Sequence, residues 1–329
     1  MLISEVQACD ISSWYESYKD LTYPTTLLPL PKAVLEYLKE DSSLILPSEC
    51  DSEGYFDQNS SDSECELEDE GSEEGPRPSF PEFSTALQEV LKQGTGKFFI
   101  KLNWSSPRDA HWVSSSGLLC KTLTDVYLLL KSSHFILHDL TNPFKDCQKN
   151  SEEEKNAALQ GSQYVLALRE WSSINPGHEF RCFVRGGNLI GISQRDPTSF
   201  YDYILRQETS IKRSILNFFE SRLRDFPLQS FVFDVVSSSK GGITLMDFNP
   251  FGPTTDGLLF EWEELLNYEE GTELSEVEFR CIREERGIRS DTIRMYSLPT
   301  DVIDIANGTD RDKLISFLEL QAEMQNKKT

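Results

Sequence analysis

The sequence predicts an α+β protein made of two small lobes, and three observations support this. Short strand-like runs between residues 164 and 250 are broken by Pro-Gly and Gly-Gly turns. Longer segments at 83–93, 122–131 and 199–224 have helical patterns. No internal repeat is visible, and 329 residues are enough to bury a sizeable core. We expect the two lobes to meet near residues 171–177.

Residues 1–48 are expected to form an N-terminal segment that packs on the core. Trp14, Tyr15 and Tyr18 provide apolar anchors in this segment, and residues 33–38 have a helical pattern. Large aromatic side chains contribute much buried area when they pack, so an ordered segment is expected here.

An acidic, low-complexity stretch follows at residues 49–78. Between positions 49 and 76 it holds twelve Asp or Glu residues and no Lys or Arg. Such a composition cannot offset the entropy lost on ordering, so we expect a disordered loop. Ser60, Ser61 and Ser63 lie among these acids, which makes phosphorylation by an acid-directed kinase a hypothesis. A solvating loop without regulation is the alternative.

The two lobes are expected to span residues 79–172 and 173–329. The first lobe is expected to contain a helix at 83–93, a buried strand at 98–102, a helix at 122–131, a polar loop at 145–162 and a strand at 164–171. The second is expected to contain strands at 179–185 and 189–194, a helix at 199–224, a hairpin of 231–236 with 243–250, a short helix at 261–267, a charged loop at 268–290 and a closing helix at 311–325.

Composition excludes several classes of protein. The formal net charge is −23, which argues against binding nucleic acid by phosphate neutralisation. The seven cysteines include no Cys-x-x-Cys pair, a pattern typical of reduced thiols rather than a disulfide framework or a zinc site. The N-terminus lacks a basic, apolar leader, and no run approaches the roughly 20 apolar residues of a membrane span. We therefore expect a cytoplasmic protein that binds neither membranes nor nucleic acid.

The most informative motif is the hairpin that carries Asp234 on its first strand and Asp247 and Asn249 on its second. Residues two apart on a strand face the same way, so Asp247 and Asn249 share a face. Three oxygen donors on one face can hold Mg²⁺, which commonly shares its shell with phosphates. Asp-x-Asn at a strand end is also common turn chemistry. Asp234 favours the metal site, because a carboxylate among apolar neighbours is costly unless it is paired or bound to metal.

Two further strand ends carry groups that could contact a nucleotide. Lys101 ends an apolar strand and could reach a phosphate as a point charge, although an ordinary edge lysine is the alternative. Arg169 and Trp171 end a later strand, where backbone groups beside an aromatic ring could hold adenine. For Trp171 simple packing is the alternative.

Alternation places Glu179 and Arg181 on one face of a strand, and the neighbouring strand ends in Gln194, Arg195 and Asp196. A solvated ion pair would explain Glu179 with Arg181 alone. Because two neighbouring strands deliver these polar groups together, the sequence favours a phosphate-facing surface.

Several enzyme classes can be tested directly against the sequence. The residues Phe99-Ile-Lys101 and Asp247-Phe-Asn249 have counterparts in protein kinases, but neither a Gly-rich loop before Lys101 nor a His-Arg-Asp catalytic loop is present. Leu-Asn-Trp after Lys101 excludes a lysine-adenylate nucleotidyltransferase. Walker A and Gly-x-Ser-x-Gly sequences are missing, and the four histidines form no zinc or triad pattern.

The order of these groups resembles the ATP-grasp superfamily. Along the chain, this order is a strand that carries Lys, a strand that ends in an adenine hinge, a strand with Glu-x-Arg, and then an acidic residue followed by an acid-x-Asn motif. The motifs Lys101-Leu-Asn-Trp-Ser-Ser-Pro-Arg-Asp-Ala-His-Trp, Glu179-Phe-Arg-Cys-Phe-Val, Ile190-Gly-Ile-Ser-Gln-Arg-Asp and Met246-Asp-Phe-Asn-Pro-Phe-Gly resemble the cell division cycle 123 protein family over nearly the whole chain. The resemblance implies two lobes with mainly antiparallel sheets that clamp ATP.

The resemblance also implies a role for each site residue. Mg²⁺ would be held by Asp234, Asp247 and Asn249, which would also belong to the ATP site. Lys101 and Arg181 would contact phosphates; Trp104, Ser106 and Arg108 would close over the nucleotide; Arg169, Glu170 and Trp171 would form the adenine hinge; Glu179 and Asp196 would hold the ribose or support neighbouring groups.

Family membership implies a monomeric assembly factor rather than an enzyme with a known reaction. It would act on the gamma subunit of eukaryotic translation initiation factor 2, promoting assembly of the heterotrimer and supporting translation initiation and cell-cycle progression. A carboxylate–amine ligase that forms an acyl-phosphate is one alternative, and it predicts ADP release that depends on a small carboxylic acid. A scaffold with a vestigial nucleotide site is another. Whether ATP is hydrolysed does not follow from the sequence.

Overall fold

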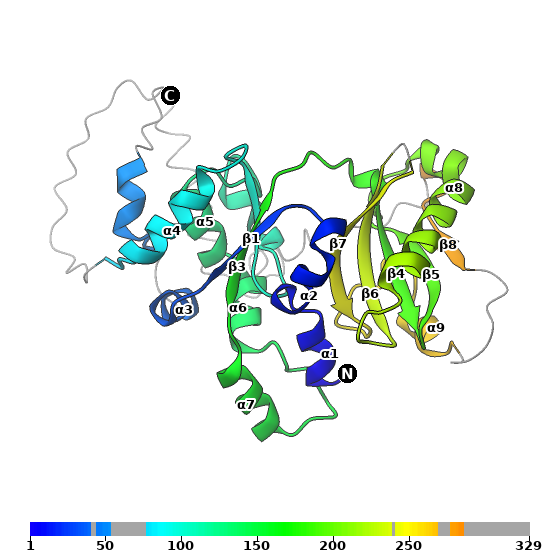
Figure 1. Cartoon of the computed structure of the whole chain (residues 1–329), viewed down its shortest axis with the longest axis horizontal. Helices are drawn as coiled ribbons and strands as arrows, with labels where there is room; N and C mark the ends of the chain where they lie inside the picture. The colour runs from blue at the N-terminus through cyan, green and yellow to red at the C-terminus, as the bar shows by residue number, and fades with distance from the viewer. Residues whose placement is uncertain (41–43, 54–76, 239–240, 269–276, 286–329) are drawn as a thin grey trace, which may run out of the picture.

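A computed structural model describes residues 1–40, 44–53, 77–238, 241–268 and 277–285 of the chain. The described residues form two sheets side by side, each with helices packed around it (Figure 1). One sheet has three strands in the order β1-β3-β2, and the other has five in the order β7-β6-β4-β5-β8. The α+β architecture with two lobes and mainly antiparallel sheets is confirmed.

The N-terminal segment contacts both sheets. It consists of α1 (Ile3–Ala8), α2 (Ile11–Tyr18), the 3₁₀ turn η1 (Lys19–Leu21), β1 (Thr25–Pro29) and α3 (Lys32–Lys39). Asp10 caps α2 by accepting from the backbone N–H of Ser12 at 2.8 Å. Strand β1 joins the first sheet, whereas Trp14 is buried against Phe248 of the second lobe, with ring centroids 5.3 Å apart. The segment therefore ties the two sheets together.

The first lobe surrounds the three-stranded sheet, in which both strand pairs are antiparallel. Its elements are η2 (Ser48–Glu53), α4 (Pro81–Leu91), β2 (Phe98–Lys101), η3 (Arg108–Val113), α5 (Leu123–Lys131), α6 (His134–Thr141), α7 (Glu152–Gly161) and β3 (Val165–Glu170). Its core is built from apolar residues of the sheet and of α4, α5 and α6, including Leu87, Ile100 and Leu129.

Helix α7 corrects the expectation of a loop at 145–162. Ser151 and Glu154 form a capping box: the Ser151 hydroxyl accepts from the Glu154 N–H at 3.2 Å, and the Glu154 carboxylate accepts from the Ser151 N–H at 2.8 Å. Such a box satisfies backbone donors at the helix start, so a polar helix forms here with no buried residue. The Ser-x-x-Glu signature was readable from the sequence.

The second lobe is built on the five-stranded sheet. Its elements are η4 (Pro176–His178), β4 (Glu179–Arg185), β5 (Asn188–Gln194), α8 (Asp202–Phe218), the π-helical turn η5 (Phe219–Leu223), β6 (Phe231–Ser237), β7 (Ile243–Pro250), α9 (Trp262–Leu266) and β8 (Glu278–Arg280). Helix α8 and η5 pack on one face of the sheet through a core that includes Ile215, Phe219 and Phe233. Strand β8 pairs in parallel with β5 inside the segment expected to be a charged loop at 268–290.

Some expectations lie outside the described residues. They are the closing helix at 311–325, most of the acidic loop, and the three serines within that loop. Within the described ranges, no helix is long and apolar enough to cross a membrane.

Candidate nucleotide and metal site

Two carboxylates face each other on the second sheet. Asp234 on β6 and Asp247 on β7 are directly paired, and the register shifts at the next position, where Val235 pairs with Leu245 and Met246 is left over as a bulge. Directly opposite residues in an antiparallel pair lie on the same face within about 5 Å, so two negative charges here repel one another. The arrangement needs positive charge nearby.

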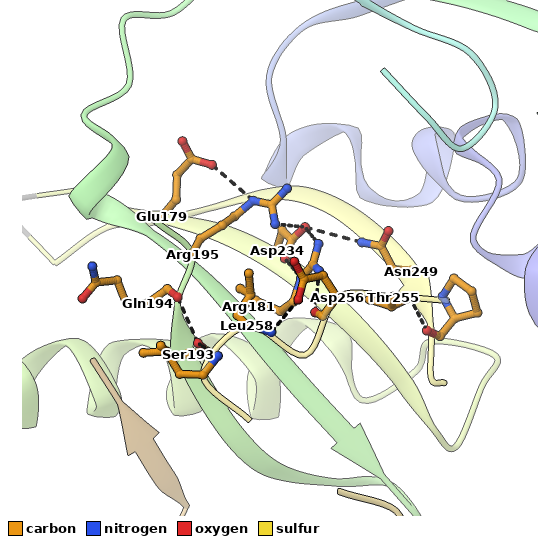
Figure 2. A network of polar contacts seen from close by, with 12 residues as sticks. Glu179, Arg181, Ser193, Gln194, Arg195, Asp234, Asn249, Thr255, Asp256 and Leu258 are labelled. Atoms are coloured by element: carbon orange, nitrogen blue, oxygen red, sulfur yellow. Dashed lines mark hydrogen bonds and ion pairs between the residues drawn. The ribbon is translucent and has the colours of Figure 1, made fainter. Parts of the chain in front are cut away.

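Arg181 on β4 supplies positive charge to Asp234, its direct cross-strand neighbour. The guanidinium donates to both Asp234 oxygens, at 2.8 and 2.9 Å, and also to the Asp256 carbonyl at 2.8 Å (Figure 2). Both side chains are about 5% exposed. Burial alone would raise the pKa of Asp234, but the positive charges of Arg181, Arg195 and Arg108 hold it well below its usual range. Asp234 is therefore ionised, and Arg181 is fully engaged.

Lys101 supplies positive charge to Asp247 from the other sheet. Its Nζ lies 2.6 Å from Asp247 Oδ2, and the lysine side chain is 4% exposed. The second carboxylate oxygen, Asp247 Oδ1, is buried and has no hydrogen-bond partner among the described residues. A buried, charged oxygen without a partner is costly, so it marks a place where a cation would be stabilised.

Asn249 completes the set of oxygen donors. It lies two residues beyond Asp247, and its amide nitrogen is 3.4 Å from Asp234 Oδ2. Two carboxylates and an amide suit Mg²⁺, which prefers oxygen ligands. No cluster of three or more His, Cys, Asp or Glu side chains that could hold a metal occurs in the part of the chain that the structure describes. The residues present fit a magnesium ion.

A second contact between the sheets comes from Arg169, at the end of β3. The Arg169 guanidinium donates to the carbonyl of Met246, the bulge residue of β7, at 2.8 Å. Burial lowers the pKa of Arg169, and its second terminal nitrogen has no partner within the described ranges. Arg169 therefore supports the bulge that sets the register of Asp247. Its predicted part in an adenine hinge stays a prediction.

The backbones of the other two hinge residues are already hydrogen-bonded. The Glu170 N–H donates to the Pro24 carbonyl at 3.0 Å, and the Trp171 N–H donates to the Lys97 carbonyl at 2.9 Å. Both side chains are half-buried. An adenine ring could therefore use only the carbonyls or side chains of these residues.

Glu179 and Arg195 lie at the outer edge of the charged cluster. Arg195 Nε is 3.4 Å from Glu179 Oε2, and Arg195 Nη1 is 3.6 Å from Asp234 Oδ2 (Figure 2). Burial raises the pKa of Glu179, and the charge of Arg195 acts against that rise. The neighbouring Arg195 guanidinium is also the main cause that lowers the pKa of Arg108 to about 10. Positive charges thus crowd one corner of the sheet, which favours an anion there.

Other predicted residues make contacts of their own. The Trp104 indole donates to the Val6 carbonyl at 2.8 Å and packs edge-on against Phe144, which anchors the N-terminal segment. Asp196 accepts from the Thr198 N–H at 2.9 Å and from the Tyr201 hydroxyl at 2.6 Å. The Ser106 carbonyl accepts from the Arg108 N–H at 2.8 Å. None of these contacts involves a nucleotide, so the expected roles of Trp104 and Ser106 in closing over it and of Asp196 in holding the ribose stay predictions.

Gln194 corrects the expectation of a phosphate-facing amide. Its side chain is fully buried, donates to the Ser199 carbonyl at 2.8 Å and accepts from the Ile282 N–H at 3.0 Å. Gln194 faces the side of β5 opposite to that of Ser193 and Arg195, because side chains alternate along a strand. Its function is to hold the chain that follows β5.

Two buried polar residues near Lys101 escaped sequence reasoning. Asn103 donates to Asp10 at 2.7 Å and to the Gln163 carbonyl at 2.9 Å. Asp139 of α6 accepts from the backbone and the hydroxyl of Ser105, at 2.7 and 2.9 Å. Asn103 lies two residues beyond the end of the buried strand β2, and a polar residue so close to an apolar strand is a signal in the sequence. Nothing in the sequence around Asp139 distinguishes that residue.

An open cavity of about 450 Å³ lies apart from this site, between α2 and the chain that leads to β6. Its lining includes Trp14, Tyr18, Arg222 and Phe226, and none of the predicted site residues.

Comparison with known proteins identifies the family. The sequence profile of D123 matches residues 14–306. The chain belongs to the D123 family. A relative from Xenopus tropicalis, named translation initiation factor eIF2 assembly protein, is 42% identical over 336 residues, which cover 98% of each chain. A relative with the same name from Dictyostelium discoideum is 31% identical and covers 94% of each chain.

Solved structures agree with this assignment. Cdc123 from Schizosaccharomyces pombe matches with a TM-score of 0.69 at 33% identity, over 86% of this chain and 99% of that one. The recognition of the cell division cycle 123 family from its motifs is therefore confirmed, and D123 membership covers both lobes.

Proposed function

We propose that this chain binds Mg²⁺-ATP between its two sheets and assists the assembly of eukaryotic translation initiation factor 2 by binding its gamma subunit. The assembly role is supported by relatives that carry the name eIF2 assembly protein and match this chain along nearly its full length. Because the similarity covers both lobes and the N-terminal segment, it is not limited to one shared module. The cytoplasm, where translation factors are assembled, is the compartment that fits this role.

The observation that carries the nucleotide proposal is the pair of facing carboxylates, Asp234 and Asp247, each matched with a buried cation. Lys101 comes from one sheet and Arg181 from the other, so the charges converge where the sheets meet. Bound Mg²⁺ would offset the charge of the phosphates between these groups. Asp247 Oδ1 is the free oxygen that would hold it, together with oxygens of Asp234 and Asn249.

Lys101 and Arg181 would have different roles in nucleotide binding. Lys101, at the tip of β2, would exchange its contact with Asp247 for one with a phosphate. Arg181, with all three of its hydrogen bonds to the protein, would hold Asp234 in position rather than contact phosphate. The nucleotide would then join the lobes more firmly than Lys101 alone, which preorganises a surface for the gamma subunit.

The test of nucleotide binding is Asp247→Asn. We expect calorimetry to show Mg²⁺-ATP affinity reduced about tenfold or more, because a charged metal ligand is lost while its shape is kept. Asp202→Asn, which removes a surface carboxylate paired with Arg206 on α8, should leave affinity unchanged. Undiminished affinity in Asp247→Asn, with unchanged thermal unfolding, would rule out this magnesium site.

The test of assembly is capture of the purified gamma subunit. The wild-type chain should bind it, and binding should weaken in Asp247→Asn when Mg²⁺-ATP is present. If the gamma subunit binds wild type and Asp247→Asn equally well, the assembly role is supported and its dependence on nucleotide is contradicted. Failure of the wild-type chain to bind the gamma subunit would contradict the partner itself.

A further inference from the structure

Arg195 is held less tightly than Arg181, the other arginine beside Asp234. Its guanidinium lies 3.4 Å from Glu179 and 3.6 Å from Asp234, and no hydrogen bond joins it to another side chain in the described parts of the chain. By contrast, Arg181 makes two hydrogen bonds below 3.0 Å to Asp234 and a third to the Asp256 carbonyl. Figure 2 shows both arginines directed at the same carboxylate.

The backbone of Arg195, unlike its side-chain end, is firmly fixed. Its N–H donates to the Glu179 carbonyl at 3.0 Å, which continues the pairing of β4 with β5. The preceding residue, Gln194, is buried and ties this turn to Ser199 and Ile282. A fixed base with a loosely held guanidinium describes a side chain that can exchange partners without moving the backbone.

Strand order places Arg195 at the far end of a row of charged groups. From the side facing the first sheet outward, the strands run β7, β6, β4, β5, and their facing residues are Asp247, Asp234, Arg181 and Ser193. Arg195 lies two residues beyond Ser193, so it projects from the same face. Lys101 and the end of β3, where the adenine hinge is predicted, lie at the opposite end of this row, beside β7. Figure 1 shows β7 as the strand nearest to the first sheet.

A nucleotide laid along this row has only one direction that fits the proposed function. With its base at the end of β3 and its first phosphates near Lys101, its chain of phosphates crosses the facing carboxylates and ends near Arg195. Mg²⁺ held by the facing carboxylates would lie beside the last phosphates of ATP, and the terminal one would lie nearest to Arg195. The planar fork of an arginine suits a terminal phosphate, which exposes three oxygens.

We propose that Arg195 distinguishes a nucleoside triphosphate from a diphosphate: without nucleotide it neutralises Glu179 and Asp234, and with a triphosphate it turns to the terminal phosphate. The proposal rests on the proposed nucleotide site. It assigns the role of terminal-phosphate contact to Arg195 rather than to Arg181. The neighbouring guanidinium of Arg108 adds positive charge to the same corner.

The test compares ATP with ADP by calorimetry in the presence of Mg²⁺. In Arg195→Met we expect affinity for ATP to fall about tenfold or more, since one charge-assisted contact is lost, and affinity for ADP to change less than about threefold. Arg195→Lys keeps the positive charge but loses the planar guanidinium, so its affinity for ATP should lie between those of wild type and Arg195→Met. Arg224→Met, which removes a surface arginine paired with Glu220, is the matched control and should change neither.

A second measurement needs no nucleotide. Mn²⁺ alone, followed by the relaxation of water protons, should bind at least about threefold more tightly to Arg195→Met than to wild type, because a positive charge beside Asp234 is gone. This measurement also shows that the variant is folded at the site.

The possible outcomes separate the two proposals. If wild type binds neither nucleotide with Mg²⁺, the nucleotide site itself is wrong and the role of Arg195 falls with it. If wild type binds both nucleotides, the proposed nucleotide site is supported. If Arg195→Met then loses affinity for ATP and ADP equally, or for neither, the proposal that Arg195 distinguishes them is overturned. An unchanged Mn²⁺ affinity would contradict its role as a counter-charge.

Discussion

At the scale of single residues, the structure contains a carboxyl group with an unusual pKa. Asp139 of α6 is buried beside the chain that follows Lys101. Burial raises its pKa to about 7, although the hydrogen bonds from Ser105 and the charge of Lys101 act against the rise. In the unfolded chain the same group would ionise near pH 3.9. Between these values the folded state binds more protons than the unfolded state, so stability falls as pH rises.

Asp139→Asn tests this dependence on pH. The variant cannot ionise, so its free energy of unfolding, measured relative to wild type with urea, should rise between pH 5 and pH 8, by on the order of 1–3 kcal/mol. Asp146→Asn, at an exposed position nearby, should show no such trend. A difference between wild type and Asp139→Asn that stays constant with pH would mean that Asp139 is ionised throughout.

At the scale of elements, strand β5 depends on a residue without a side chain. A Cβ added to Gly191 would lie 2.8 Å from the ring of Phe260, which is buried against β5 together with Phe183 and Val232. The ring therefore occupies the space that any other residue at position 191 would need. This contact closes the face of the sheet on which the cluster of Phe260 and its neighbours packs.

Gly191→Ala should destabilise the protein by about 1–3 kcal/mol, because the Phe260 ring must move in a packed region. The double variant Gly191→Ala with Phe260→Leu should lose less than the sum of the two single changes, since the smaller side chain leaves room. Gly252→Ala is the control, because a Cβ there meets nothing within 4 Å. Denaturant unfolding measures all four variants; strict additivity would show that the clash is absent.

At the scale of the whole molecule, the N-terminal segment holds the two sheets together through one buried amide. Asn103 donates to Asp10 and to the Gln163 carbonyl and accepts from the Val165 N–H at 3.0 Å. Asp10 begins α2, and Trp14 of α2 packs on Phe248 of the second lobe. The lobes are thus joined by the Asn103 contacts as well as by Lys101 and Arg169.

Asn103→Ala should destabilise the fold by about 2–4 kcal/mol, because it leaves several buried polar groups without partners. Asn142→Ala, at an exposed position, should change stability by less than about 0.5 kcal/mol. Hydrogen exchange should also show earlier opening of α1 and α2 in Asn103→Ala than of the strands. Equal opening of all elements would argue that the segment is not a separate linking unit.

Most elements of the fold were predictable because their apolar patterns are strong. The strands at 179–185 and 189–194 and the hairpin with Asp234 and Asp247 lie within about one residue of the expected bounds. Helix α7 was missed because it buries nothing and depends on its cap. Strand β8 was missed because three residues beside β5 have no pattern of their own. In both cases periodicity carries no signal.

The sequence by itself determined the family, the α+β class and the two acidic strands, because each depends on motifs or on alternation along a continuous stretch. Only the tertiary structure decided which cation serves which carboxylate. Lys101 meets Asp247 across 146 positions of sequence, Arg181 is committed to Asp234, and Arg195 is left loosely held. These pairings are set by strand order, by the bulge at Met246 and by the packing of one sheet beside the other, and no local pattern encodes them.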